Sequence, residues 1–181
     1  MTKIKNFNDL YEILPKNIKN KLNMNKDLVE NPIYHPEPNA FEHIKIVIDR
    51  LVLTKDINLI LSGLFHDICK KESSVARTNS SYMLCLNHEK LGADFAIINQ
   101  DFIKALGGDI NQVYYICRNH MRMKVFNEMK KTKQKEISNS PYYFKLKIFA
   151  QADKMTKPFN FSYFDLLFFK IKNFLLTLKL A

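Results

Sequence analysis

Histidine and aspartate residues are spread along this sequence at intervals that suit a shared metal site. The side chains that could serve as ligands are His43, the adjacent pair His66-Asp67, His88, His120 and Asp153. Successive members of this set are separated by roughly the length of one helix plus one connection. Helical bundles build internal metal sites in this way, because each facing helix projects a ligand into the core. We therefore expect these side chains to converge on one buried site.

The adjacent pair His66-Asp67 indicates where that site lies. Neighbouring side chains on a regular helix point about 100° apart and cannot both grip one ion. At a helix end both can turn toward one pocket, and the apolar run before His66 stops just ahead of Lys70. A set of imidazoles and carboxylates favours a divalent ion that keeps positions open for water and phosphate. We expect Mg, Mn, Ni, Co, Fe or Zn.

The residues around these ligands resemble a known family. His43, His66-Asp67 and Asp153 match the H…HD…D signature of the HD-domain metal-dependent phosphohydrolase superfamily. Four strings occur in the order found in the HD domain appended to bacterial tRNA nucleotidyltransferases: His35-Pro36-Glu37 with Phe41-Glu42-His43, LFHDICK at 64–70, NHEKLGA at 87–93, and NHMR at 119–122. The similarity covers about residues 31–156.

The sequence departs from that family at several points. Cys69 and Pro38 stand where the family usually has glycine. The residues before His35 are too few for a nucleotidyltransferase head and lack its paired acids. We therefore expect a stand-alone HD module that does not add CCA to tRNA.

The resemblance implies a role for each candidate residue. It assigns the metal ligands to His43, His66, Asp67 and Asp153. For His88 and His120 it leaves two interpretations, a second metal bridged by Asp67 or contact with the scissile phosphate and proton donation to the leaving oxygen. We favour the phosphate contact.

Three further residues are candidates around the site. Lys70 is a candidate phosphate contact at the pocket rim, although a solvated helix-end lysine explains it as well. Arg122 is a second candidate phosphate contact. Glu42 is a candidate to orient His43 from behind, in addition to closing a capping box with Asn39.

The expected activity is hydrolysis of phosphomonoesters or phosphodiesters of nucleotides or RNA ends, including 2′,3′-cyclic phosphates, by water activated on the bound ion. One alternative is a hydrolase of free nucleotides, of the deoxynucleotidase or alarmone-hydrolase type. Another is a catalytically idle nucleic-acid-binding or regulatory module. The complete ligand set argues against an idle module.

The patterning predicts an all-α fold, a single HD-domain helical bundle with the metal site between its helices. The chain has only four glycines and few alternating strand patterns, which argues against a sandwich or barrel. Apolar spacing predicts helices at 39–52, 56–68, 87–98, 101–106, 109–121, 140–155 and 159–181, with a charged loop at 127–139. We divide the chain into an N-terminal helical segment (1–30), the HD domain (31–156) and a C-terminal amphipathic helix (157–181) that packs on the bundle.

Composition and charge bear on partners and location. The 181 residues include 28 Lys and Arg against 18 Asp and Glu, a formal net charge of +10. Such charge favours a phosphorylated nucleotide or nucleic-acid substrate, although an AT-rich genome explains it equally well. Three scattered cysteines and the lack of an apolar leader predict a cytoplasmic protein. The C-terminal helix is a candidate homodimer contact, and its charged residues argue against membrane insertion.

Overall fold

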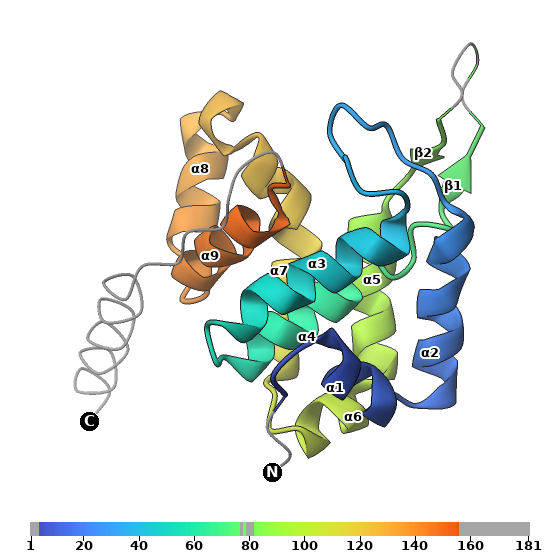
Figure 1. The fold of residues 1–181 in the computed structure, drawn as a ribbon. Helices are drawn as coiled ribbons and strands as arrows, with labels where there is room; N and C mark the ends of the chain where they lie inside the picture. The colour runs from blue at the N-terminus through green and yellow to red at the C-terminus, as the bar shows by residue number, and fades with distance from the viewer. Residues whose placement is uncertain (1–3, 77, 79–81, 156–181) are drawn as a thin grey trace.

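The computed structural model describes residues 4–76, 78 and 82–155. Within these residues the fold is all-α, with nine α-helices, two 3-10 segments and a two-stranded sheet (Figure 1). The predicted fold class is therefore confirmed. None of the described helices has the length and apolar character needed to cross a membrane. The C-terminal helix predicted at 159–181, and with it the expected dimer contact, lies outside the described residues.

The helices follow one another with short connections. Their bounds are α1 (Phe7–Ile13), α2 (Lys16–Asn23), η1 (Met24–Asp27), α3 (Ala40–Val52), α4 (Ile57–Phe65), α5 (His88–Ile98), α6 (Gln100–Ala105), α7 (Ile110–Lys124), η2 (Phe126–Glu128), α8 (Lys131–Ser138) and α9 (Tyr143–Asp153). The strands β1 (Ser74–Val75) and β2 (Leu84–Cys85) pair antiparallel between α4 and α5.

Helix α4 lies at the centre of the bundle. Every residue from Leu59 to Phe65 is buried, as expected for a helix that is apolar nearly all round. It packs against α3, α5, α7 and α9, and α7 in turn packs against α5 and α9. The elements that carry the predicted ligands are therefore in mutual contact around α4.

The N-terminal helices belong to the same hydrophobic core. Leu10 of α1 and Ile18 and Leu22 of α2 are fully buried in the cluster that includes the α3 and α4 side chains. The backbone N–H of Phe7 also donates to Asp49 Oδ1 on α3 at 2.6 Å. The N-terminal helices α1 and α2 thus help to hold α3 in place.

Two predicted helix starts are confirmed. The Asn39 side chain accepts from the Glu42 N–H at 2.9 Å at the start of α3. Asp109 accepts from the Asn111 N–H at the start of α7. Each side chain satisfies a backbone donor that lacks a partner within its helix.

A third predicted helix, 87–98, also has the expected bounds, because α5 follows Asn87 directly and ends at Ile98, but Asn87 adopts a left-handed conformation (φ 56°) and its side chain does not cap the helix. The predicted start of the helix at Ser140 is wrong. Helix α9 begins at Tyr143, because Ser140 and Pro141 form a turn in which Ser140 Oγ accepts from the Tyr142 N–H.

The predicted loop at 127–139 is also wrong, because residues 131–138 form α8. Its Lys, Gln and Glu residues favour helix, and a single buried side chain, Ile137, anchors it to the bundle. The hydroxyl of Tyr115 on α7 also donates to the Ile137 carbonyl at 3.3 Å. One apolar residue in eight leaves no helical stripe in the sequence, so charge alone suggested a loop.

Candidate metal centre

The pair His66-Asp67 stands at the C-terminal end of α4, where the helix stops. Phe65 is the last helical residue, and His66 is the C-cap residue. The backbone of His66 itself is still helical (φ −59°, ψ −41°), and its Nε2 lies 3.1 Å from Asp67 Oδ2. The turn that follows is held by the buried Asn25, whose amide donates to the Ile68 carbonyl at 2.9 Å and accepts from the Lys71 N–H at 3.1 Å.

Three of the predicted ligands, His43, His66 and Asp153, meet on the Oδ2 side of the fourth, Asp67. His43 Nε2 lies 3.4 Å from Asp67 Oδ2, 3.3 Å from His66 Nε2 and 3.0 Å from Asp153 Oδ1. Asp153 Oδ1 lies 3.7 Å from His66 Nε2. All four residues are buried, although they come from α3, the end of α4 and the end of α9.

The other oxygen of Asp67 faces the remaining two histidines. His88 Nε2, at the start of α5, lies 3.3 Å from Asp67 Oδ1, and His120 Nε2, on α7, lies 3.5 Å from it. The ligand atoms of Asp67, His88 and His120 all lie within 4.8 Å of one another. Asp67 thus stands between two groups of imidazoles, one on each of its oxygens.

All four histidines are held from behind in the same way. In each ring Nε2 faces Asp67 while Nδ1 contacts an acceptor: Glu37 for His43, the Gly63 carbonyl at 2.9 Å for His66, the Cys85 carbonyl at 3.0 Å for His88 and the Cys117 carbonyl at 2.7 Å for His120. In the neutral form of each ring, Nδ1–H donates to that acceptor and the Nε2 lone pair is available. Histidines that bind metals are oriented by this kind of contact.

Several atoms at the centre are buried without a hydrogen-bond partner among the described residues. They include Asp67 Oδ1, His88 Nε2 and His120 Nε2. Buried polar atoms without partners are costly, and a cation would satisfy all three together. The donor set of imidazoles and carboxylates is also one that divalent transition metals accept. These residues therefore fit a metal ion.

Two lysines, the buried Lys70 and the exposed Lys124, balance the carboxylates. Lys70 Nζ lies 2.8 Å from Asp67 Oδ2 and 2.6 Å from Glu30 Oε1. Lys124 Nζ lies 3.0 Å from Asp153 Oδ2. Burial would raise the pKa of both aspartates, but His66 and Lys70 hold the pKa of Asp67 well below its usual value, as Lys124 and His43 do for Asp153. Both carboxylates are therefore ionised at neutral pH.

The histidines divide into two electrostatic groups. Burial would lower the pKa of His43, but hydrogen bonds to Asp153 and Glu37 raise it to about 9. Burial is the largest effect on His88 and His120, and the pKa of each is lowered. In the absence of a cation, His43 is thus protonated at neutral pH, and His88 and His120 are neutral.

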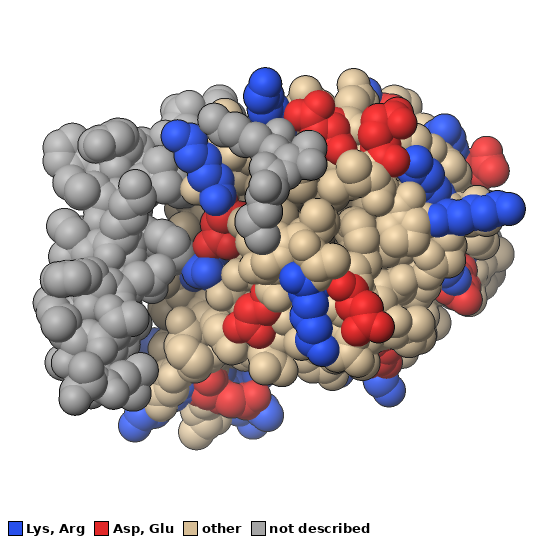
Figure 2. All heavy atoms as spheres, turned by 90° about the horizontal axis from the view of Figure 1, so that it is seen from below, with Lys and Arg blue, Asp and Glu red and all other residues tan. Residues whose placement is uncertain are grey.

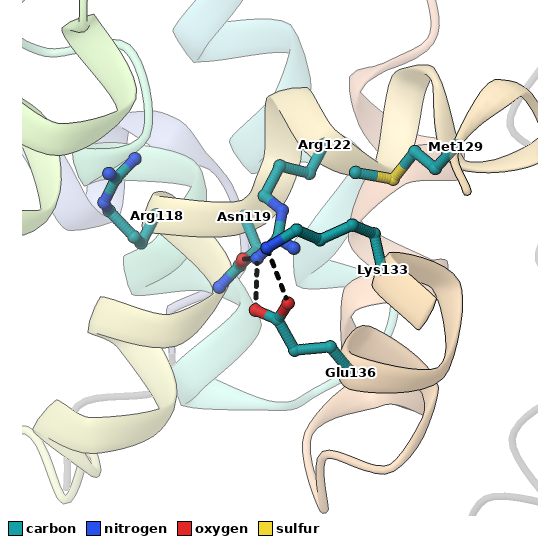
Figure 3. Close-up of a pocket in the computed structure, with 6 residues that line it drawn as sticks. All are labelled: Arg118, Asn119, Arg122, Met129, Lys133 and Glu136. Carbon is teal, nitrogen blue, oxygen red and sulfur yellow. Dashed lines mark hydrogen bonds and ion pairs between the residues drawn. The ribbon is translucent and has the colours of Figure 1, made fainter. Parts of the chain in front are cut away.

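The three further candidates lie elsewhere than the sequence suggested. Lys70 is buried between Asp67 and Glu30 and is not a solvated residue at a pocket rim. Arg122 Nη1 donates to Asn119 Oδ1 at 2.9 Å and to Glu136 at 3.2 Å, in a separate cavity (Figure 3). Glu42 Oε2 pairs with Lys45 at 3.3 Å, and the carboxylate behind His43 is that of Glu37.

Sequence reasoning overlooked the residues that hold the ligands in position. Glu37, Glu30 and Asn25 come from loop or 3-10 segments without periodicity, and only the string His35-Pro36-Glu37 pointed toward one of them. Arg50 is a further case, because its guanidinium donates to the Ala152 carbonyl at 2.9 Å and the Lys154 carbonyl at 3.2 Å. These bonds tie the end of α9, and therefore Asp153, to α3.

Comparisons with known proteins do not connect this site to any family. No family model, no curated protein and no solved structure matches the chain.

Proposed function

We propose that this protein is a metal-dependent phosphohydrolase of the HD-domain type, acting on phosphomonoesters or phosphodiesters of nucleotides or RNA ends. One observation carries the proposal: four imidazole Nε2 atoms, each held from behind through Nδ1, surround the two oxygens of Asp67. A merely structural cluster would pair these atoms with one another. Among the described residues, Asp67 Oδ1, His88 Nε2 and His120 Nε2 have no hydrogen-bond partner. The motif order H…HD…D, which resembles that superfamily, supports the same reading.

The proposal assigns a first ion to His43, His66, Asp67 and Asp153. A divalent ion held there would lower the pKa of a bound water and offset charge on a phosphoryl oxygen. The protein's own contribution is to keep these donors in place. Lys70 keeps Asp67 ionised, and Lys124 does the same for Asp153.

For His88 and His120 the geometry favours a second ion over direct phosphate contact. Their Nε2 atoms and Asp67 Oδ1 form a compact buried group of potential ligands. Both rings are neutral, as ligation requires, because burial lowers their pKa values. Asp67 would then bridge two ions through its two oxygens.

The proposal is tested with metal-depleted protein. Hydrolysis of a panel of nucleotide monoesters, diesters and 2′,3′-cyclic phosphates is measured after adding Mg, Mn, Ni, Co, Fe or Zn. We expect activity with at least one ion, and a loss of about 100-fold or more in His66→Ala and Asp67→Ala. Asp101→Ala, which removes an exposed carboxylate on α6, is the matched control and should retain activity.

Two results would contradict the proposal. One is full activity in either ligand variant, and the other is activity that persists after chelation. Stoichiometric metal without hydrolysis of any substrate would favour an idle binding module. A preference for deoxynucleotides or alarmones would favour the free-nucleotide hydrolase.

A further inference from the structure

A cavity of about 390 Å³ lies between α7 and α8. Its lining residues are Arg118, Asn119, Arg122, Met129, Lys133 and Glu136 (Figure 3). A space of this size admits a phosphate group with part of its sugar. The metal centre does not use these side chains.

Two of the three cationic side chains that line this cavity converge on one carboxylate, whereas the third, Arg118, pairs with Glu89 at 3.2 Å. Arg122 Nη1 lies 3.2 Å from Glu136 Oε1, and Lys133 Nζ lies 3.3 Å from Glu136 Oε2 (Figure 3). Phosphate is bound in the same way, with a guanidinium and an ammonium each contacting one oxygen of the anion. The Glu136 side chain is 52% exposed, and exposed ion pairs are weak. A phosphate can therefore displace it at little cost.

The surrounding sequence concentrates positive charge. Residues 118–136 contain seven Lys and Arg and two Glu, a net charge of +5, which is half of the +10 of the whole chain. The face of the molecule seen in Figure 2 instead shows Lys and Arg interspersed with Asp and Glu. A local excess of this kind attracts polyanions rather than a single small anion.

Helix geometry separates this cavity from the metal centre. Arg118 and Arg122 stand two residues before and after His120 on α7, so they point about 160° away from it around the helix. A phosphate in the cavity would thus be separated from the histidines by the width of a helix, about 10 Å. It is therefore not the phosphate that is hydrolysed.

We propose that the cavity between α7 and α8 binds a backbone phosphate of a single-stranded oligonucleotide, several nucleotides from the end that occupies the metal centre. This inference rests on the proposed function for the identity of that end, and it narrows the substrate class from nucleotides in general to strands. Arg122 and Lys133 contact the phosphate, and Glu136 is the competing anion that leaves.

The test measures binding without hydrolysis. A fluorescent single strand of about eight nucleotides, within the range that one binding domain covers, is titrated with the full-length protein in chelator, and anisotropy is followed at several salt concentrations. We expect Arg122→Gln/Lys133→Gln to weaken binding about 10-fold and to lower the log–log salt slope by about 1 to 1.5. Glu136→Gln should tighten binding about threefold, because it removes the competitor.

The control variant loses the same number of positive charges at a different part of the surface. Lys16→Gln/Lys104→Gln removes two exposed lysines from α2 and α6, which lie away from α8 (Figure 1), and should weaken binding less than threefold. Equal weakening by both double variants, or no change with Glu136→Gln, would overturn the proposal. Equally tight, Arg122-dependent binding to anionic lipid vesicles would overturn it too.

The readout separates the two proposals. Hydrolysis of mononucleotides without strand binding would leave the metal centre standing and remove the cavity from the substrate path. Strand binding that depends on the cavity, without hydrolysis in the presence of any of the metals, would support the cavity proposal and contradict the proposed hydrolase function.

Discussion

The carboxylate of Glu37 contacts Nδ1 of His43, so the side chain behind this ligand comes from the loop between η1 and α3 and not from α3 itself. Glu37 also accepts from His35 Nδ1 at 3.1 Å, and its side chain is only 2% exposed. The pKa of Glu37 is lowered to about 2, because its contacts with His35 and His43 outweigh the effect of burial, which would raise it. Glu37 is therefore a fixed anion that sets the orientation of one ring.

Replacing this anion should weaken metal binding. We expect Glu37→Gln to lower metal affinity about 10- to 100-fold, the usual effect of removing a carboxylate behind a ligating histidine. Glu42→Gln is the matched control, since Glu42 pairs with Lys45, and it should change affinity less than about threefold. Calorimetric titration of metal-depleted protein measures both values. A larger loss of metal affinity in Glu42→Gln than in Glu37→Gln would instead indicate that Glu42 orients His43.

Metal binding should release a proton near neutral pH. The pKa of His43 is raised to about 9, whereas ligation through Nε2 requires the neutral ring. We expect release of about one proton from His43 at pH 7.5, seen as a dependence of calorimetric heat on buffer ionisation enthalpy. Affinity should rise with pH and level off above about 9. Heats that do not depend on the buffer would contradict this prediction.

The raised pKa of His43 makes the stability of the metal-free protein change with pH in the direction opposite to metal affinity. A group whose pKa is raised on folding stabilises the fold fully below its unfolded value of 6.5, and that contribution disappears as pH rises through about 9. The metal-free protein should therefore lose stability between pH 6.5 and 9 while metal affinity increases. Thermal denaturation in chelator across this range measures the loss.

Lys70 should matter more for folding without metal than with it. Lys70→Met leaves Asp67 and Glu30 buried without their counterion, which should destabilise the metal-free protein by about 3 kcal/mol. A bound ion would compensate Asp67 and reduce this difference. The neighbour Lys71, whose Nζ donates to the Asp27 carbonyl at 3.4 Å, supplies the control Lys71→Met, with an expected effect below about 0.5 kcal/mol. Urea denaturation with and without metal compares the two.

Gly92 allows α5 to approach the end of α4. A Cβ added there would lie 2.3 Å from the Phe65 carbonyl oxygen and 3.0 Å from that of His66, and backbone atoms cannot move aside cheaply. We expect Gly92→Ala to destabilise the fold by about 2 to 3 kcal/mol and to weaken metal binding, because it displaces the turn that carries His66.

Gly63 provides the matched control for this effect. A Cβ on Gly63 would meet only side-chain atoms closer than 3.4 Å, Leu51 Cδ1 at 3.0 Å and Ile48 Cγ1 at 3.2 Å. Gly63→Ala also gains helix propensity, so its net cost should stay below about 1 kcal/mol. Equal losses in the free energy of unfolding for Gly92→Ala and Gly63→Ala would contradict the prediction that the backbone contact at Gly92 makes its substitution more costly. Denaturation midpoints decide the comparison.

The ligand-bearing part of the fold was predictable because its signals are local. Imidazoles and carboxylates within or at the ends of apolar helical segments favour a shared buried site, so residue type and order predicted that the six candidate ligands converge. The family resemblance singled out His43, His66, Asp67 and Asp153. The pair His66-Asp67 indicated a helix end close by, because adjacent side chains on a regular helix diverge. The apolar spacing nevertheless extended the predicted helix to residue 68, three residues beyond Phe65. Caps such as Asn39 and Asp109 depend on neighbours a few residues away.

Local pattern alone determined the helical class of this protein, the elements that carry ligands and the kind of ion they suit. Tertiary structure decided which carboxylate supports His43, how Lys70 is buried, that α8 is a helix, and that Arg122 faces a cavity on the far side of α7 from His120. These features depend on packing between segments distant in the chain. A buried loop side chain or a lone anchoring residue such as Ile137 leaves no periodic signal, because its energy comes from a neighbour that sequence order does not reveal.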